Sequence, residues 1–297
     1  MIAASEAFPV AWIPKEGSSV RREGYLYNNY PESSIVIETP EGNTTFDLGG
    51  FKTIGIVEYE RGMRKDVALY ANIALRYEIH KFVVKENDRN GAKVSLQDTS
   101  VDIEIGGKKQ LLNIVGKNTN DVLTALLGVA PGSTYLSKKN LFSRNNAYLV
   151  SGISYGRSFF FKYNGFAEIS IMDKIYFHYG LNEVIVNASL GLKSAEKHEV
   201  SVGILATTGN IPYMSSGLEH LHSSLNKNSQ ASEQTKAILD QELRKLLLPK
   251  LVRKKINLYF SNSYNISEGK QITLSVANEM PLRKGVWGIK LEFVIFK

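Results

Sequence analysis

Cysteine and long apolar stretches are both missing from this sequence of 297 residues, and each absence excludes a class of protein. Without cysteine the chain forms no disulfide, no thiolate metal site and no cysteine nucleophile. Without a run of about 18 apolar residues it offers no transmembrane helix. Such a chain can cross a bilayer only as a closed barrel, because each backbone N–H and C=O group must find its partner within the wall.

Signatures of nucleic-acid and nucleotide binding are also missing. The net charge is +7, and a basic chain can attract nucleic acid, an anionic membrane or an anionic solute. The lysines are scattered with no basic stripe and no nucleic-acid motif, so we expect no nucleic-acid partner. Residues 106–109 (GGKK) lack the spacing of a phosphate-binding loop and a following helix, and we interpret them as a turn.

What the sequence does contain is long alternation of apolar and polar residues. Between residues 66 and 80, one face of an extended chain carries only apolar side chains: Val67, Leu69, Ala71, Ile73, Leu75, Tyr77 and Ile79. Because successive side chains of a strand point to opposite faces, this pattern predicts one strand of about 15 residues. Ordinary strands have about 5–6 residues and a tilted membrane strand needs roughly 9–11, so the length favours the wall of a membrane barrel.

The alternation recurs along the chain and predicts an all-β fold, a single antiparallel up-and-down transmembrane β-barrel of about 12 strands that forms one domain, residues 1–297. The expected strands cover residues 18–29, 50–62, 66–82, 98–106, 121–130, 146–158, 165–178, 183–193, 198–208, 252–265, 270–279 and 285–296. Most connections are short, and the long ones are residues 30–49, 83–97, 131–145 and 209–251. Short turns at one rim and mostly long loops at the other are typical of barrels in the outer membrane of Gram-negative bacteria.

Two segments fall outside the expected wall. Residues 209–251 are interpreted as a long loop, in which apolar residues at helical spacing predict a helix over residues 232–248 that ends before Pro249. We expect this helix to pack on a rim, with the barrel mouth and the lumen as alternative places. Residues 1–17 form an N-terminal segment with two open interpretations, the remnant of a removed signal peptide or a plain disordered start.

Three short motifs resemble a poorly characterised family of proteobacterial outer-membrane β-barrels that is porin-like or channel-like. Residues 11–17 (AWIPKEG) are similar to the mature start of those proteins, and residues 188–193 (ASLGLK) to a later hairpin. Residues 60–65 (ERGMRK) are similar to their E-Y-G-L-x-D hairpin, with Arg61 and Lys65 in place of Tyr and Asp. The resemblance implies an outer-membrane barrel, possible channel activity, and no catalytic residues.

The last strand carries a second resemblance. Residues 286–293 (VWGIKLEF) resemble the C-terminal strand that the barrel-assembly machinery reads, although residues 294–297 extend past its final aromatic. The expected partners are therefore outer-membrane lipid and the barrel-assembly machinery, and the expected location is the cell outer membrane.

Candidate catalytic and metal-binding residues are few. His220 and His222, followed by Ser223 and Ser224, invite comparison with outer-membrane phospholipases, but they lie in the long loop with no evident third residue to orient the base. Two histidines two residues apart also lack further ligands at metal-site spacing. We therefore expect no enzymatic activity, no metal and no cofactor, and a phospholipase-like enzyme is a minor alternative.

In a barrel, the polar positions of each strand would face the lumen. The expected lumen-lining residues are Lys52, Glu58, Glu60, Asn72, Arg76, Glu78, His80, Asn187, Lys193, Lys255, Asn257, Lys290 and Glu292. Mixed charges across a lumen can pair and keep it narrow, or form a polar path whose lining sets its selectivity. Twelve strands lie between the filled barrels of about eight strands and the open porins of about sixteen. We expect a narrow porin-like channel for a small polar or anionic solute, or a structural surface barrel.

The alternative function is that of a soluble all-β binding module, in which the apolar strand faces would form a core. Aromatic belts at both rims would separate the two hypotheses, because membrane barrels place such residues at the lipid–water interfaces. The candidates near predicted strand ends are Tyr27, Tyr30, Tyr59, Phe82, Tyr155, Phe159, Phe177, Tyr179 and Tyr264.

Overall fold

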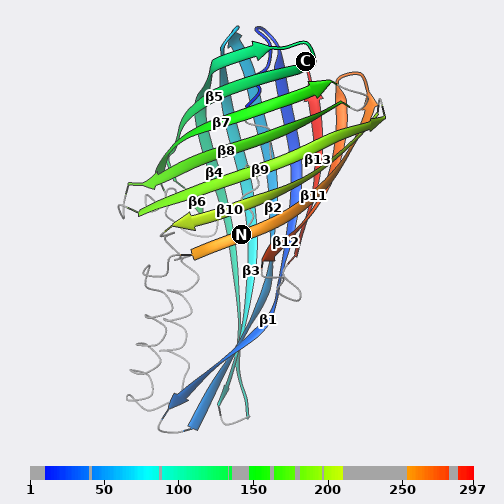
Figure 1. Ribbon diagram of the computed structural model, residues 1–297. Coiled ribbons are helices and arrows are strands. Elements are labelled where there is room, and N and C mark those ends of the chain that lie inside the picture. The colour runs from blue at the N-terminus through cyan, green and yellow to red at the C-terminus, as the bar shows by residue number, and fades with distance from the viewer. Residues whose placement is uncertain are drawn as a thin grey trace.

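The fold is a single antiparallel sheet that closes on itself (Figure 1). The computed structural model describes residues 11–39, 42–86, 89–132, 134–135, 147–160, 164–177, 181–195, 197–209, 253–280 and 287–297. The strands are β1 (Ser19–Thr39), β2 (Gly42–Arg64), β3 (Val67–Glu86), β4 (Arg89–Val115), β5 (Thr119–Ala130), β6 (Thr134–Tyr135), β7 (Tyr148–Phe160), β8 (Asn164–Tyr176), β9 (Leu181–Ala195), β10 (His198–Gly209), β11 (Arg253–Ser267), β12 (Lys270–Met280) and β13 (Trp287–Phe296).

Closure of the sheet makes it a barrel. β1 pairs with β2 on one side and with β13 on the other, and the pairing with β13 runs from Val20↔Phe296 to Asn29↔Trp287. Every other wall strand pairs antiparallel with its neighbours in chain order. The two-residue strand β6 is not one of the 12 barrel strands, and it pairs with Ser100 and Val101 of β4 beyond the end of β5. The prediction of an all-β, up-and-down barrel of 12 strands is therefore confirmed.

The two ends of the barrel differ. At one end, called here the turn-side rim, tight turns join β2 to β3, β4 to β5, β9 to β10 and β11 to β12. Beyond the opposite end, β1, β2, β3 and β4 continue together well past the wall (Figure 1). The prediction of long loops at residues 30–49 and 83–97 is wrong, because the described residues of these segments belong to paired strands. The register shifts between Tyr30 and Ser33, and such an irregularity accommodates Pro31 within β1.

The predicted turn at residues 106–109 is also wrong, since these residues lie inside β4. Glycine at position 106 allows neighbouring atoms to pack closely against the β4 backbone. A Cβ added to Gly106 would lie 2.4 Å from the carbonyl oxygen of Leu127 and 2.6 Å from the Tyr70 ring. The missing side chain leaves room for Tyr70 inside the barrel, and strand glycines commonly mark such close approaches.

The surface of the wall is the inverse of that of a water-soluble protein. In β13, Ile289, Leu291 and Phe293 are exposed, whereas Lys290 and Glu292 between them are 6% and 4% exposed. The same inversion recurs on the other wall strands, where large apolar residues are 36–76% exposed. Moving one such half-exposed side chain from water into an apolar medium gains about 1 kcal/mol. Summed over the wall, this exceeds the net stability of about 5–15 kcal/mol of a typical domain, so the outer face suits lipid.

Three predictions concern residues that the structure does not describe. The predicted helix over residues 232–248 and the remainder of its loop lie in residues 210–252, which the structure does not describe. The connection at 131–145 is described only at residues 131–132 and 134–135. No helix among the described residues is both long and apolar enough to span a membrane.

Candidate functional site: the barrel interior

Most of the expected lumen-lining residues are buried on the inner side of the wall. Those that are 0–6% exposed are Lys52, Glu58, Glu60, Asn187, Asn257, Lys290 and Glu292. Asn72 and Arg76 are partly buried, and Lys193 is exposed at the turn-side rim. The side chains of Glu78, His80 and Lys255 are outside the description. Burial brings these residues into one interior, whereas their use as a permeation path stays a prediction.

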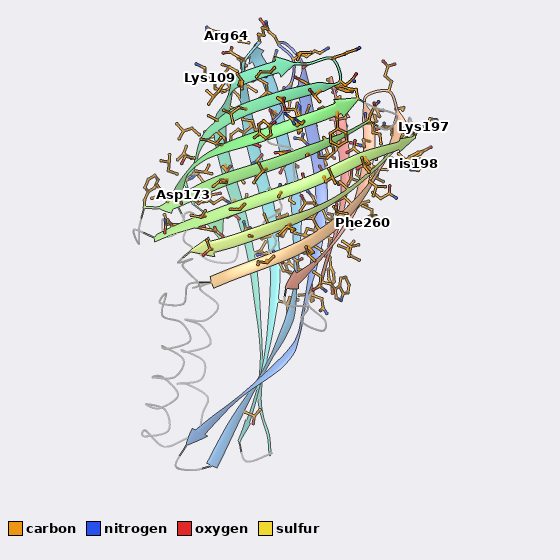
Figure 2. All side chains as sticks on the ribbon, viewed as in Figure 1. Arg64, Lys109, Asp173, Lys197, His198 and Phe260 are labelled. Carbon is orange, nitrogen blue, oxygen red and sulfur yellow. The ribbon has the colours of Figure 1, made fainter. Side chains whose placement is uncertain are left out.

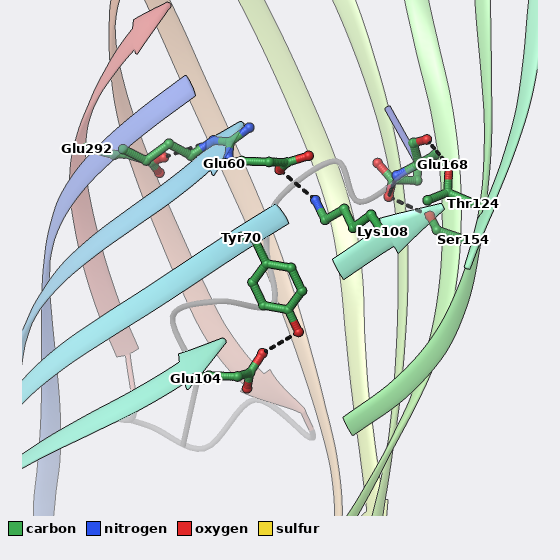
Figure 3. A network of polar contacts seen from close by, with 10 residues as sticks. Glu60, Tyr70, Glu104, Lys108, Thr124, Ser154, Glu168 and Glu292 are labelled. Carbon is green, nitrogen blue, oxygen red and sulfur yellow. Dashed lines mark hydrogen bonds and ion pairs between the residues drawn. The ribbon is translucent and has the colours of Figure 1, made fainter. Parts of the chain in front are cut away.

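A cluster of alternating charges occupies the interior near the turn-side rim. Lys108 Nζ donates to Glu60 Oε2 at 2.7 Å, joining β4 to β2 (Figure 3). Lys290 Nζ lies 2.9 Å from Glu292 Oε2 on β13, and Arg22 of β1 lies 4.0 Å from the same carboxylate. Pairing is required here, because a buried charge without a partner costs several kcal/mol.

The charges of this cluster balance. Glu58 of β2 is 5% exposed and lies opposite Arg22 in the strand register. The acidic members are Glu58, Glu60 and Glu292, and the basic members are Arg22, Lys108 and Lys290. A balanced lining provides contacts for ions of both signs and favours neither strongly.

A tyrosine–carboxylate group lies further along the interior. Tyr70 of β3 donates from its hydroxyl to Glu104 Oε1 at 3.1 Å, and Tyr148 of β7 donates to Glu104 Oε2 at 2.7 Å. Lys174 Nζ lies 5.1 Å from the centre of the Tyr148 ring, within the range of a cation–π contact. These contacts link β3 and β4 to β7 and β8 (Figure 3 shows Tyr70 and Glu104).

The inner faces of β5, β7, β8, β9 and β10 carry an apolar cluster among polar residues such as Thr124 and Glu168. A buried cluster packs together Tyr70, Leu126, Val150, Met172, Ile185 and Leu205. Ile185 is 0% exposed, and Val150 and Leu205 are 1% exposed. Side chains packed to this degree leave no room for a solute between them, so any path must pass beside this cluster.

An N-terminal segment, residues 11–18, crosses the interior, and we call it the N-terminal strap. Ala11 is fully buried, and its backbone N–H donates to Glu168 Oε1 at 3.2 Å. Thr124 donates from its hydroxyl to the Ala11 carbonyl oxygen, and Ser154 donates to the same Glu168 oxygen at 2.9 Å (Figure 3). The backbone of Ala11 is thereby held by Thr124 of β5 and Glu168 of β8, and Ser154 of β7 supports Glu168.

The other end of the strap is held by β2 at the turn-side rim. Gly17 N–H donates to the Gly62 carbonyl oxygen at 3.0 Å, and Gly62 N–H donates to the Ser18 carbonyl oxygen at 3.0 Å. Between the two ends, the Trp12 ring meets Phe166 edge-on with ring centres 5.9 Å apart. Because β2 and β8 are separated by β3, β4, β5 and β7, the strap spans part of the lumen and narrows it.

Several residues of the barrel interior were not predicted from the sequence. They are Tyr70, Glu104, Lys108, Thr124, Ser154 and Glu168. Interpreting residues 106–109 as a turn hid Lys108. The alternation along β7 and β8 could have pointed to Ser154 and Glu168, because they share the parity of the buried face. The strap contact had no sequence signal, since it joins residues more than 100 positions apart.

Aromatic side chains gather at both rims. Away from the turns, Tyr27 lies 6.0 Å from Phe51 and 5.8 Å from Trp287, and Phe51 lies 6.2 Å from Tyr77, measured between ring centres. Tyr59, Tyr155 and Tyr264 are exposed towards the turn-side rim. Of the other candidates, Phe159 and Phe177 are described at strand ends, and the side chains of Tyr30, Phe82 and Tyr179 are not described. Two aromatic zones flanking an apolar wall are typical of a membrane barrel.

Metal and catalytic candidates find no support in the described part of the chain. It contains no group of three or more His, Asp or Glu residues arranged to hold a metal ion. His220, His222, Ser223 and Ser224 lie outside the described residues.

Comparisons with known proteins agree with the fold at low similarity. No protein-family model matches the sequence, and no curated protein matches it. An outer membrane channel from Pseudomonas putida F1 is similar in structure, with 10% identity, 99% of this chain and 98% of that chain covered, and a TM-score of 0.46. The translocator domain of the autotransporter NalP from Neisseria meningitidis has 6% identity, coverage of 95% and 88%, and a TM-score of 0.40. The transport unit of the autotransporter AIDA-I from Escherichia coli has 9% identity, coverage of 98% and 93%, and a TM-score of 0.40. At these scores, the fold rests on the strand pairing and exposure of the chain itself.

Proposed function

We propose that this protein is an outer-membrane β-barrel that acts as a narrow channel for small polar solutes. The observation that carries the proposal is the inversion of the wall, with apolar side chains exposed and charged side chains buried, as in β13. An outward apolar face meets lipid, and an inward polar face forms a path for water and solutes. A soluble binding module is not favoured, because it would leave this apolar face in water.

The selectivity of the channel follows from its lining. The cluster of Arg22, Lys108 and Lys290 with Glu58, Glu60 and Glu292 carries no net charge, so we propose weak discrimination between small anions and cations. The N-terminal strap and the apolar cluster occupy much of the lumen, which limits the solute to a small size.

A structural surface barrel without conductance is the second candidate function. The close packing around Ile185 and Leu205 favours it, because a filled lumen conducts little. The two candidates share the same wall and differ only in whether a continuous path exists.

The test has two stages. The chain is expressed with a signal peptide, outer membranes are isolated, and samples are run on a gel with and without boiling. A closed barrel resists detergent and migrates faster without boiling, whereas a soluble protein with no mobility shift would contradict the membrane barrel. Conductance in a planar lipid bilayer then separates the candidates, since small discrete steps support a channel and silence supports a structural barrel.

A further inference from the structure

Exposed positive charge gathers at one end of the described part of the molecule. Among the side chains that the structure describes, every exposed Lys or Arg lies at the turn-side rim or in the strap that meets it. They are Lys15, Arg21, Arg61, Arg64, Lys65, Lys109, Lys117, Arg157, Lys193, Lys197, Lys270 and Lys297. Figure 2 shows Arg64, Lys109 and Lys197 at this end of the barrel. The exposed acidic residues of the same rim include Glu16, Asp66 and Glu268.

The densest part of this charge surrounds the turn between β2 and β3. In the strand register Arg64 and Lys109 both lie opposite Val67, so their backbones are two strand spacings apart, about 10 Å. Arg61 pairs with Leu69 just below, and Lys65 is in the turn. Arg61, Arg64, Lys65 and Lys109 together are called here the basic patch.

The basic patch is not neutralised by ion pairs. Elsewhere on the rim, Arg21 pairs with Glu23, and Arg157 Nη2 lies 3.0 Å from Asp121 Oδ2. Among the described residues, none of the four cations of the patch forms such a pair. Asp66 in the same turn offsets one of the four charges, and Lys15 and Glu16 nearby offset each other. The patch therefore keeps a net positive charge that faces outwards.

The patch is continuous with the apolar wall. On the outer face of β2, Tyr59 is 41% exposed and Met63 48%, and Arg61 lies between them. On β3, Leu69 is 50% exposed beside Arg61. Along β2 the order is thus apolar, aromatic and cationic, with Met63 beyond Arg61. A protein surface that meets hydrocarbon, then the interface, then phosphate groups would have this order.

We propose that the basic patch binds the headgroups of anionic phospholipids in the membrane leaflet at the turn-side rim. Arginine and lysine close to an anionic membrane surface each strengthen the attraction by roughly fivefold in affinity at low salt. The guanidinium groups of Arg61 and Arg64 are suited to phosphate oxygens, because their N–H groups can form two parallel hydrogen bonds. This inference rests on the membrane location proposed above and adds a lipid preference to it.

The experiment measures which lipids stay bound to the full chain. The protein is refolded into vesicles of phosphatidylcholine with a one-fifth fraction of phosphatidylglycerol, extracted in mild detergent, and its retained lipids are identified by native mass spectrometry. We expect phosphatidylglycerol to be enriched among the retained lipids of the wild type. The variant R61Q/R64Q/K65Q/K109Q should return the phosphatidylglycerol fraction of the retained lipids to about the one-fifth of the vesicles, and the charge-conserving variant R61K/R64K/K65R/K109R should keep most of the enrichment. Raising the salt to 0.5 M should weaken the enrichment in the wild type.

Three outcomes would overturn the inference. Equal enrichment in the glutamine variant would place the lipid preference elsewhere, and no enrichment in the wild type would remove it. Displacement of the lipid by millimolar inorganic phosphate would show a site for small anions instead. A chain that fails to give a heat-modifiable band in the vesicles would contradict the membrane barrel itself. A heat-modifiable, inserted barrel without lipid preference would contradict this inference alone.

Discussion

At the scale of the residue, the face of the strand decides the role of a side chain. Ile289 and Leu291 meet the outside, and Lys290 between them meets a carboxylate inside. One residue of register shift would place charges in lipid and leucines in the lumen, so the pairing is strongly specified. The buried ion pairs then matter more than exposed ones, because each partner would be costly to leave alone.

The pair of Lys108 and Glu60 provides a direct prediction. Lys108→Met leaves Glu60 buried without its partner, so we expect a loss of about 3 kcal/mol in the free energy of unfolding and a shift of conductance towards cations. Glu60→Gln should shift it towards anions. The reversal potential in a salt gradient measures both shifts. The double variant K108M/E60Q should return to nearly wild-type selectivity, and identical reversal potentials in all four proteins would remove the pair from the path.

At the scale of the element, the N-terminal strap is the part that narrows the lumen. Gly156 of β7 makes its docking possible, since an added Cβ would lie 2.6 Å from the Trp12 ring and 2.7 Å from Ala11 Cβ. Gly55 of β2 is a matched glycine with nothing within 4 Å of an added Cβ. Comparing valine substitutions at these two glycines therefore separates the effect of displacing the strap from the general effect of a larger side chain in a strand.

We predict that Gly156→Val displaces the strap and raises single-channel conductance, while Gly55→Val leaves it unchanged. The fluorescence of Trp12, measured in a Trp287→Phe background because the chain has two tryptophans, should become more accessible to a water-soluble quencher in the Gly156→Val protein. Unchanged quenching together with unchanged conductance would show that the strap does not limit the path.

The elements also show how far sequence reasoning reaches. Alternation located all twelve wall strands, because the period of two and the apolar outer face are local properties of each strand. The extensions of β1 to Thr39 and β3 to Glu86 were missed, since Pro31 and the polar residues near it are as common in loops as in irregular strands. The residues that line the interior were predicted only in part. Parity identified Glu58 and Glu60, whereas the clamp of Thr124 and Glu168 on Ala11 depends on the closed fold.

At the scale of the whole molecule, the barrel has two chemically different surfaces and two different ends. The wall is apolar outside and charged within, the turn-side rim is basic, and the opposite end carries the extension of β1 to β4 (Figures 1 and 2). Among the described side chains, the exposed lysines and arginines come together at one rim only after the sheet closes, while Lys52, Lys108 and Lys290 lie inside the barrel. The central claim is that lipid, not water, surrounds the wall.

The most direct measurement compares two arginine substitutions in vesicles. Ile73 lies in the middle of the outer wall beside Val57 and Ile103, and Met63 lies at the turn-side rim; both are exposed. Unfolding by guanidinium in phosphatidylcholine vesicles should show Ile73→Arg to be less stable than the wild type by about 2–4 kcal/mol, and Met63→Arg by no more than about 1 kcal/mol. In a water-soluble protein both exposed positions would tolerate arginine within about 0.5 kcal/mol. A large loss at Ile73 alone is the result that a lipid-facing wall predicts, and equal small losses at both positions would contradict it.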